Sequence, residues 1–147
     1  QKVNWKDLDF IIVDMPPGTG DTQLTFSQEI KMDGAIIVST PQEVALLDVK
    51  RGIKMFDKLG VKIIGLIDNM SFFIGDDGKK YTIFGEGGVK KTADEFKKDF
   101  LGEIPINIEV GKSGDGGKPI VEDKPDHYIS KIYINLANKI KSAYLNE

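Results

Sequence analysis

Short apolar runs alternate with longer amphipathic stretches in the first half of the chain. Runs rich in Ile, Val and Leu at residues 10–13, 34–39 and 61–67 predict strands that are buried on both faces of a sheet. Residues 22–29 predict a short helix. Residues 43–59 carry apolar side chains at helical spacing, after a start signal at residues 40–43 and before Gly60. This alternation predicts βαβ units with right-handed crossovers, and therefore a mostly parallel sheet with helices on both faces.

The second half is less regular. A turn at residues 74–80, between aromatic flanks, predicts a hairpin, and it is followed by a predicted helix at 89–98 and a strand at 100–105. Residues 111–119 predict a long polar loop. The last predicted helix, 126–145, has an apolar face made of Ile129, Ile132, Tyr133, Leu136, Ala137 and Ile140. For this helix, packing on the sheet is favoured over binding to a membrane surface, because its apolar stripe is ordinary and its basic residues are few.

The amino-acid composition excludes several classes of function. The 147 residues form one ordinary domain, and the net charge of −3 favours neither nucleic acid nor a membrane as a partner. The chain has no Cys, which excludes disulfides, thiol catalysis and cysteine-ligated metal within it and is compatible with a cytoplasmic location. His127 is the only His. We expect it to be exposed in the first turn of the last helix, so no Ser/His/Asp set can be proposed.

Polar residues follow each of the three predicted strands. They lie at residues 14–21, 40–43 and 68–71, and parallel strands would bring them to one edge of the sheet. Asp14 ends the first strand, and a loop with two prolines and two glycines follows. Such glycines let backbone N–H groups approach an anion, and a helix start at Asp21 adds favourable partial charge. This pattern indicates Mg²⁺ plus phosphate, with Asp14 on the metal side; the alternative is a strand–turn–helix corner with a capping Asp.

A phosphate-binding P-loop, G-x-x-x-x-G-K-[ST], is not found in the sequence. The nearest run, residues 111–119, has Gly117 in place of the Lys and Pro119 in place of the Ser or Thr. A surface loop explains that run better. The chain therefore shows the metal side of a nucleotide site without the phosphate cradle.

Several motifs together carry a family signature. They are Asp14-Met-Pro-Pro-Gly-Thr-Gly-Asp21, Ser39-Thr-Pro-Gln-Glu-Val-Ala-Leu-Leu-Asp48, Asn69-Met-Ser-Phe-Phe73, Ile83-Phe-Gly-Glu-Gly-Gly88 and Gly117-Lys-Pro-Ile-Val121. In this order they resemble the Mrp/ApbC branch of the ParA/MinD-like P-loop ATPases, a family linked to iron–sulfur cluster carriage and assembly. The resemblance implies a three-layer α/β P-loop NTPase fold. It also implies that residues 1–147 are the C-terminal portion of one ATPase domain, with the deviant Walker A loop upstream of Gln1.

The resemblance also implies roles for individual residues. Asp14 is similar to the Walker B/switch II acid that acts on Mg²⁺ through water. Gly18, Thr19 and Gly20 resemble the switch II backbone that senses the γ-phosphate. Asn69 resembles the residue that hydrogen-bonds adenine. The loop after Pro105 resembles the segment that lines the base, and Pro41 belongs to the same expected nucleotide-binding set.

The implied function is an ATP- and Mg²⁺-dependent iron–sulfur cluster carrier, homodimeric when complete and serving iron–sulfur client proteins. ATP hydrolysis is expected of the full-length protein and not of this chain alone. Many members carry C-x-x-C where this chain has residues 74–78, so thiolate binding of a cluster is not expected here; Asp76 and Asp77 are hard oxygen ligands. The alternatives are a ParA/MinD-like positional ATPase and a non-catalytic half-domain that binds a partner.

Overall fold

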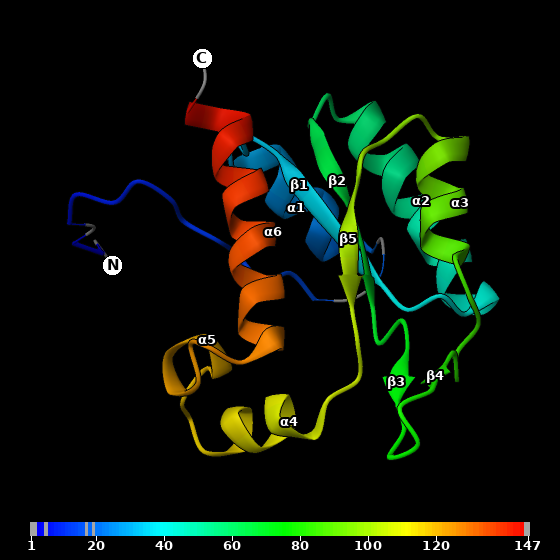
Figure 1. Cartoon of the computed structure of the whole chain (residues 1–147). Coiled ribbons are helices and arrows are strands. Elements are labelled where there is room, and N and C mark those ends of the chain that lie inside the picture. Colours follow the sequence, from blue (N-terminus) through cyan, green and yellow to red (C-terminus); the bar gives the residue numbers. More distant parts are fainter. Residues whose placement is uncertain (1–2, 5, 17, 19, 146–147) are drawn as a thin grey trace.

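The computed structural model describes residues 3–4, 6–16, 18 and 20–145 (Figure 1). Strands β1 (Ala35–Ser39), β2 (Ile63–Asn69) and β5 (Phe100–Ile104) form a parallel sheet in the order β1-β2-β5. Helices α2 (Glu43–Lys58) and α3 (Gly88–Glu95) pack on one face, and α6 (Tyr128–Leu145) packs on the other. The three layers confirm the predicted α/β architecture with a parallel sheet.

Shorter elements surround this sheet. Helix α1 (Asp21–Glu29) precedes β1, and the antiparallel hairpin of β3 (Phe73–Ile74) and β4 (Lys80–Tyr81) projects beyond the carboxyl end of β2. Helices α4 (Ile108–Asp115) and α5 (Ile120–Asp123) connect β5 to α6. The predicted helices, the hairpin and the strands that became β1, β2 and β5 are thus confirmed to within a few residues.

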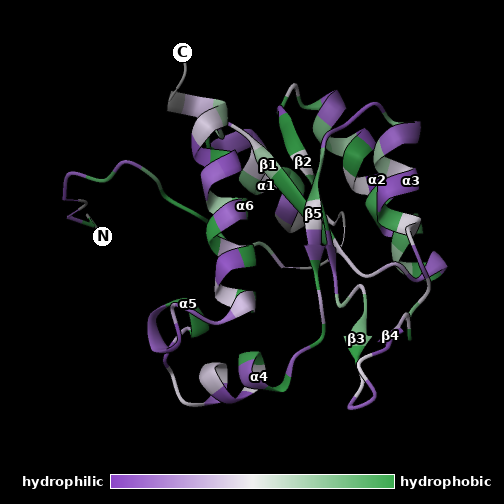
Figure 2. Cartoon of the chain, in the orientation of Figure 1, coloured by the Kyte–Doolittle hydropathy of each residue, from purple (hydrophilic) through white to green (hydrophobic). Residues whose placement is uncertain are grey.

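The core consists of two apolar clusters, one on each face of the sheet, and Figure 2 shows the hydrophobic colouring concentrated on the strands. Neighbouring side chains near the end of β2 belong to different clusters, with Leu66 on the α2–α3 side and Ile67 on the α6 side. β2 also approaches β5 very closely. A Cβ on Gly65 would lie 2.6 Å from Leu101 Cγ and 2.8 Å from the Asp99 carbonyl oxygen. A side chain at position 65 would therefore push these strands apart.

The predicted strand at residues 10–13 is wrong in this structure. Residues 10–16 of the described chain form no strand, and the side chains of residues 10–13 are all exposed, with Ile12 at 84%. The Phe10 ring makes an edge contact with Tyr144 of α6, at 6.5 Å between centroids. A strand needs a partner for its backbone N–H and C=O groups, and the described part of the chain provides none here. Strand β1 is also less buried than predicted, with Val38 56% exposed.

The predicted loop at residues 111–119 is partly helical, because α4 extends to Asp115. The Asn107 side chain accepts a hydrogen bond from the Glu109 N–H at 2.9 Å and so caps the helix. Glu109 also pairs with Lys112 one turn later. The cap and the ion pair outweigh the low helix propensity of the glycines in this segment.

Helix α6 packs on the sheet, as the apolar stripe predicted. Leu136 is buried against Ile67, Leu101 and Ile104, although Ala137 of the predicted face is exposed. His127 lies just before the helix and is half-buried rather than exposed. Its ring stacks on Tyr128, and its Nδ1 accepts a hydrogen bond from the Ile129 N–H at 3.3 Å. Among the described helices, none has the length and apolarity needed to cross a membrane.

Candidate nucleotide site

The carboxyl ends of β1, β2 and β5 meet at one edge of the sheet, as predicted for the second and third apolar runs. Ser39 is the register partner of Asp68, and Asp68 is the register partner of Glu103. Asn69 is the register partner of Ile104. Because side chains alternate along a strand, Asp68 follows Leu66 to the α2–α3 face and Asn69 follows Ile67 to the α6 face.

The structure brings Asn69 and Pro105, both predicted to contact the base, to the same edge. The Ser71 N–H and hydroxyl both donate to the Ile104 carbonyl, at 3.1 and 3.2 Å. The Ile106 N–H in turn donates to the Phe72 carbonyl at 2.7 Å. These bonds tie the segment after β2 to the segment after β5, with Pro105 buried between its neighbours. The two segments therefore form a rigid, closely spaced pair.

Pro41, also predicted to belong to the site, follows β1 and is buried. Its carbonyl oxygen would lie 2.8 Å from a Cβ on Gly88 and 3.4 Å from one on Gly85, where φ is +105°. The glycines of the Phe84–Gly88 motif thus allow the start of α3 to approach the loop after β1. That contact explains the motif as a packing requirement.

The predicted catalytic residues lie in the segment before α1, which is not part of the sheet. Asp14 is exposed in the extended segment before α1. Gly18 has φ +98° with open space around it, and Gly20 caps the start of α1. The Gln23 amide donates to the Pro16 carbonyl at 2.5 Å and holds the loop against the helix. Thr19 lies outside the described residues. Because residues 10–13 are not in the sheet, the expected convergence of three strand ends is seen for two of them.

Asp68 is the residue whose environment sequence reasoning missed. It was predicted only as one of the polar residues after the third strand, yet it is 1% exposed, and its Oδ1 has no hydrogen-bond partner among the described residues. Burial, and secondarily the charge of Glu103, raises the pKa of Asp68 to about 6, while Lys80 acts in the opposite direction. Its place after the apolar run of β2 was the available signal. The register that sets Glu103 beside it could not be obtained from the sequence.

The hairpin occupies the place where the resemblance expected cysteines. Asp77 organises its turn by accepting hydrogen bonds from the Lys79 N–H and the Tyr81 hydroxyl, at 3.0 and 2.9 Å. These bonds lower the pKa of Asp77. In the described part of the chain, no three Asp, Glu or His side chains gather as a metal-binding group. The Asp77 carboxylate therefore serves the hairpin itself.

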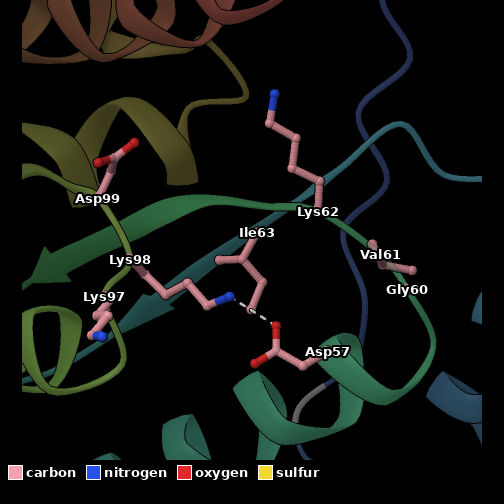
Figure 3. A pocket seen from close by; sticks show the side chains of 8 residues that line it. All are labelled: Asp57, Gly60, Val61, Lys62, Ile63, Lys97, Lys98 and Asp99. Carbon is pink, nitrogen blue, oxygen red and sulfur yellow. Dashed lines mark hydrogen bonds and ion pairs between the residues drawn. The ribbon is translucent and has the colours of Figure 1, made fainter.

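The hollow in Figure 3 lies at the opposite end of the sheet, around the start of β2 and the segment before β5. Its volume is about 370 Å³, and Lys98 and Asp57 form an ion pair of 2.8 Å within it. It is open and lined mostly by charged side chains. Ligands of open α/β sheets bind beyond the carboxyl ends of the strands, so we do not assign the nucleotide to this hollow.

A comparison with known protein families identifies the family of this chain. Residues 1–141 match the ParA model, described as NUBPL iron-transfer P-loop NTPase. The chain belongs to this family. The resemblance stated from the motifs is thereby confirmed at the level of the NUBPL/ParA family.

Curated relatives of this NUBPL/ParA chain are similar over nearly its whole length. An iron–sulfur cluster carrier protein of Synechocystis sp. is 47% identical over 141 residues, which are 95% of this chain and 40% of the relative. The iron–sulfur cluster transfer protein NUBPL of Mus musculus is 43% identical over 141 residues, 95% of this chain and 44% of the relative. The chain thus spans less than half the length of these relatives.

Solved structures agree on the fold. A nucleotide-binding protein from Archaeoglobus fulgidus, in complex with ADP, matches with a TM-score of 0.72 and 39% identity, over 83% of this chain and 50% of that one. The cell division ATPase MinD of Pyrococcus furiosus matches with a TM-score of 0.70 at 22% identity, over 92% and 52%. The latter similarity shows the fold alone.

Proposed function

We propose that this chain is the C-terminal portion of a nucleotide-dependent iron–sulfur cluster carrier and that it supplies the base side and the switch II acid of an ATP site. The observation that carries the proposal is the rigid pairing of the Asn69 segment with the Pro105 segment at the carboxyl edge of the sheet. Amide and backbone groups held there can read an adenine edge. The ADP complex of the Archaeoglobus relative supports a nucleotide ligand.

Two unpaired features support the view that the domain is completed by further chain. Strand β1 is hydrogen-bonded only to β2 among the described residues, so its other edge is open. Residues 10–13 form an apolar run of strand length that lies exposed beside α6 (Figure 2). Burial in a sheet would stabilise such a run by about 1.5–3 kcal/mol for each large side chain. The relatives are more than twice as long as this chain, so the part of them outside the match has the length to supply further strands.

The residues present fit a Mg²⁺ ion that keeps most of its water. Mg²⁺ in nucleotide sites is bound through one or two carboxylates together with phosphate oxygens, and Asp14 offers an exposed carboxylate after an apolar segment. The ion would neutralise charge that develops on the γ-phosphate. Asp14 would hold it through water, and the backbone N–H groups of Gly18, Thr19 and Gly20 would orient the terminal phosphate.

The cargo in this proposal is an iron–sulfur cluster, and its clients are iron–sulfur proteins. Because the chain contains no Cys, thiolate ligands for the cluster would come from outside these residues. A homodimer of the complete protein and a cytoplasmic location remain predictions of the same proposal. Relatives named as iron–sulfur carriers or transfer proteins favour this function over a positional ATPase.

The experiment that tests the nucleotide site uses the protein extended upstream of Gln1 in the same reading frame. Asp14→Ala should abolish Mg²⁺-dependent ATP hydrolysis and leave the circular dichroism spectrum unchanged. Asp9→Ala is the matched control, since Asp9 is another exposed acid of the same segment, and it should retain wild-type turnover. Wild-type turnover in the Asp14 variant would remove this residue from the site. If no P-loop is encoded upstream, a non-catalytic half-domain that binds a partner becomes the better interpretation of this chain.

A further inference from the structure

The β3–β4 hairpin contacts the sheet edge through one charged side chain. Lys80 Nζ lies 3.7 Å from a carboxylate oxygen of Glu103, the residue before the end of β5. It also lies 4.2 Å from the centre of the Phe72 ring, at the root of the hairpin. Lys80 thus connects the second hairpin strand to both the sheet and the hairpin's own base.

Asp68 lies beside Glu103, on the neighbouring strand β2. It is the register partner of Glu103, and it is buried with one carboxylate oxygen unpartnered among the described residues. The charged groups that act on it are Glu103 on β5 and Lys80 on β4, and its neighbour on β1 is the polar Ser39. On α2 and α3, which cover this face, Lys50 pairs with Glu95 and Lys90 with Asp94. One lysine therefore faces two carboxylates.

We propose that Lys80 locks the β3–β4 hairpin to the carboxyl end of the sheet through Glu103 and Asp68, and that protonation of Asp68 loosens this lock. An ionised Asp68 attracts Lys80 in addition to Glu103. A neutral Asp68 leaves only the single, half-exposed pair between Lys80 and Glu103. This inference rests on the geometry of the hairpin and does not depend on the proposed function.

The internal structure of the hairpin should not change over the same pH range. Its turn is held by Asp77, whose pKa is lowered by the Lys79 N–H and the Tyr81 hydroxyl. Asp77 therefore stays ionised while Asp68 titrates, because burial raises the pKa of Asp68 to about 6. Loosening would move the hairpin as a unit and change the exposure of Phe73, Ile74 and Tyr81, which are already partly in solvent.

The test is amide hydrogen exchange of residues 73–81 in the 147-residue chain, at pH 5 and pH 7.5, corrected for intrinsic exchange rates. Wild-type protection of the hairpin should be about two- to fivefold greater at pH 7.5, the range expected for a partly exposed ion pair. Lys80→Met should lower protection at pH 7.5 by at least this factor, because it also removes the pair with Glu103, and it should remove the pH dependence. Lys79→Met is the matched control, since Lys79 pairs with Asp77 inside the hairpin, and it should keep the pH dependence.

Two further variants test the inference at other residues, so that the test does not depend on a single variant that could fold poorly. Asp68→Asn should also remove the pH dependence. Glu103→Gln should move its midpoint to lower pH, because Glu103 helps to hold the proton on Asp68. Any one of three results would overturn the inference. The Lys80 variant could show the same protection as the wild type, the wild-type hairpin could show no pH dependence, or the pH dependence could survive in the Asp68 variant. Protection of α6 amides in every variant reports that the fold is intact.

Discussion

The buried carboxyl of Asp68 makes the stability of this protein depend on pH. Burial and the neighbouring Glu103 raise its pKa from about 3.8 to about 6. Between these two pH values the folded protein holds the proton more tightly than the unfolded chain does. The free energy of unfolding therefore falls as pH rises through this window and stays lower above it.

The magnitude follows from the two pKa values. Their difference of about 2 corresponds to about 3 kcal/mol, at about 1.4 kcal/mol for each unit of pKa. Solvent near the sheet edge screens part of this effect, so we expect a loss of about 1–3 kcal/mol between pH 4 and pH 7. Asn at position 68 keeps the size of the side chain and cannot ionise, so Asp68→Asn should lack this loss.

Urea denaturation of the wild type and of Asp68→Asn, at several pH values from 4 to 7.5, measures the effect. The difference in unfolding free energy between the two proteins should change by about 1–3 kcal/mol across this range, with equal urea dependence in both. Asp77→Asn is the control, because hydrogen bonds lower the pKa of Asp77 and its contribution has the opposite sign. Parallel stability profiles for the wild type and Asp68→Asn would refute the reasoning.

Two other predictions concern the sheet and the cargo. Gly65→Ala should lower the free energy of unfolding by about 1–3 kcal/mol in urea denaturation, because its Cβ would meet Leu101 and the Asp99 carbonyl. Gly52→Ala on α2, where nothing lies within 4 Å, should instead raise it by about 0.5–1 kcal/mol, and equal effects of the two would contradict the close approach of β2 and β5. Anaerobic reconstitution of this chain with iron and sulfide should give no thiolate-type charge-transfer absorption, since it has no Cys. Stable absorption with stoichiometric iron would show that the chain ligates a cluster by itself.

Local patterns in the sequence were sufficient for most secondary structure. Helix α2 follows from apolar side chains at helical spacing between a start signal and Gly60, and β2 follows from a continuous apolar run. The motifs around Asp14, Pro41 and Asn69 were sufficient for the family. These features depend on residues close together in the chain, so no knowledge of distant contacts was needed.

Features that depend on distant partners were decided by the tertiary structure. Residues 10–13 have the composition of a buried strand, yet they stay exposed, because a strand forms only when another strand satisfies its backbone groups. Capping by Asn107 made a helix of a segment whose glycines predicted a loop. The pairing of β2 with β5 put Glu103 beside Asp68, and Asp68, predicted only as a polar residue after the strand, became a buried acid. The sequence by itself determined most of the elements and the family, while strand pairing and register decided which side chains are buried and which charges meet.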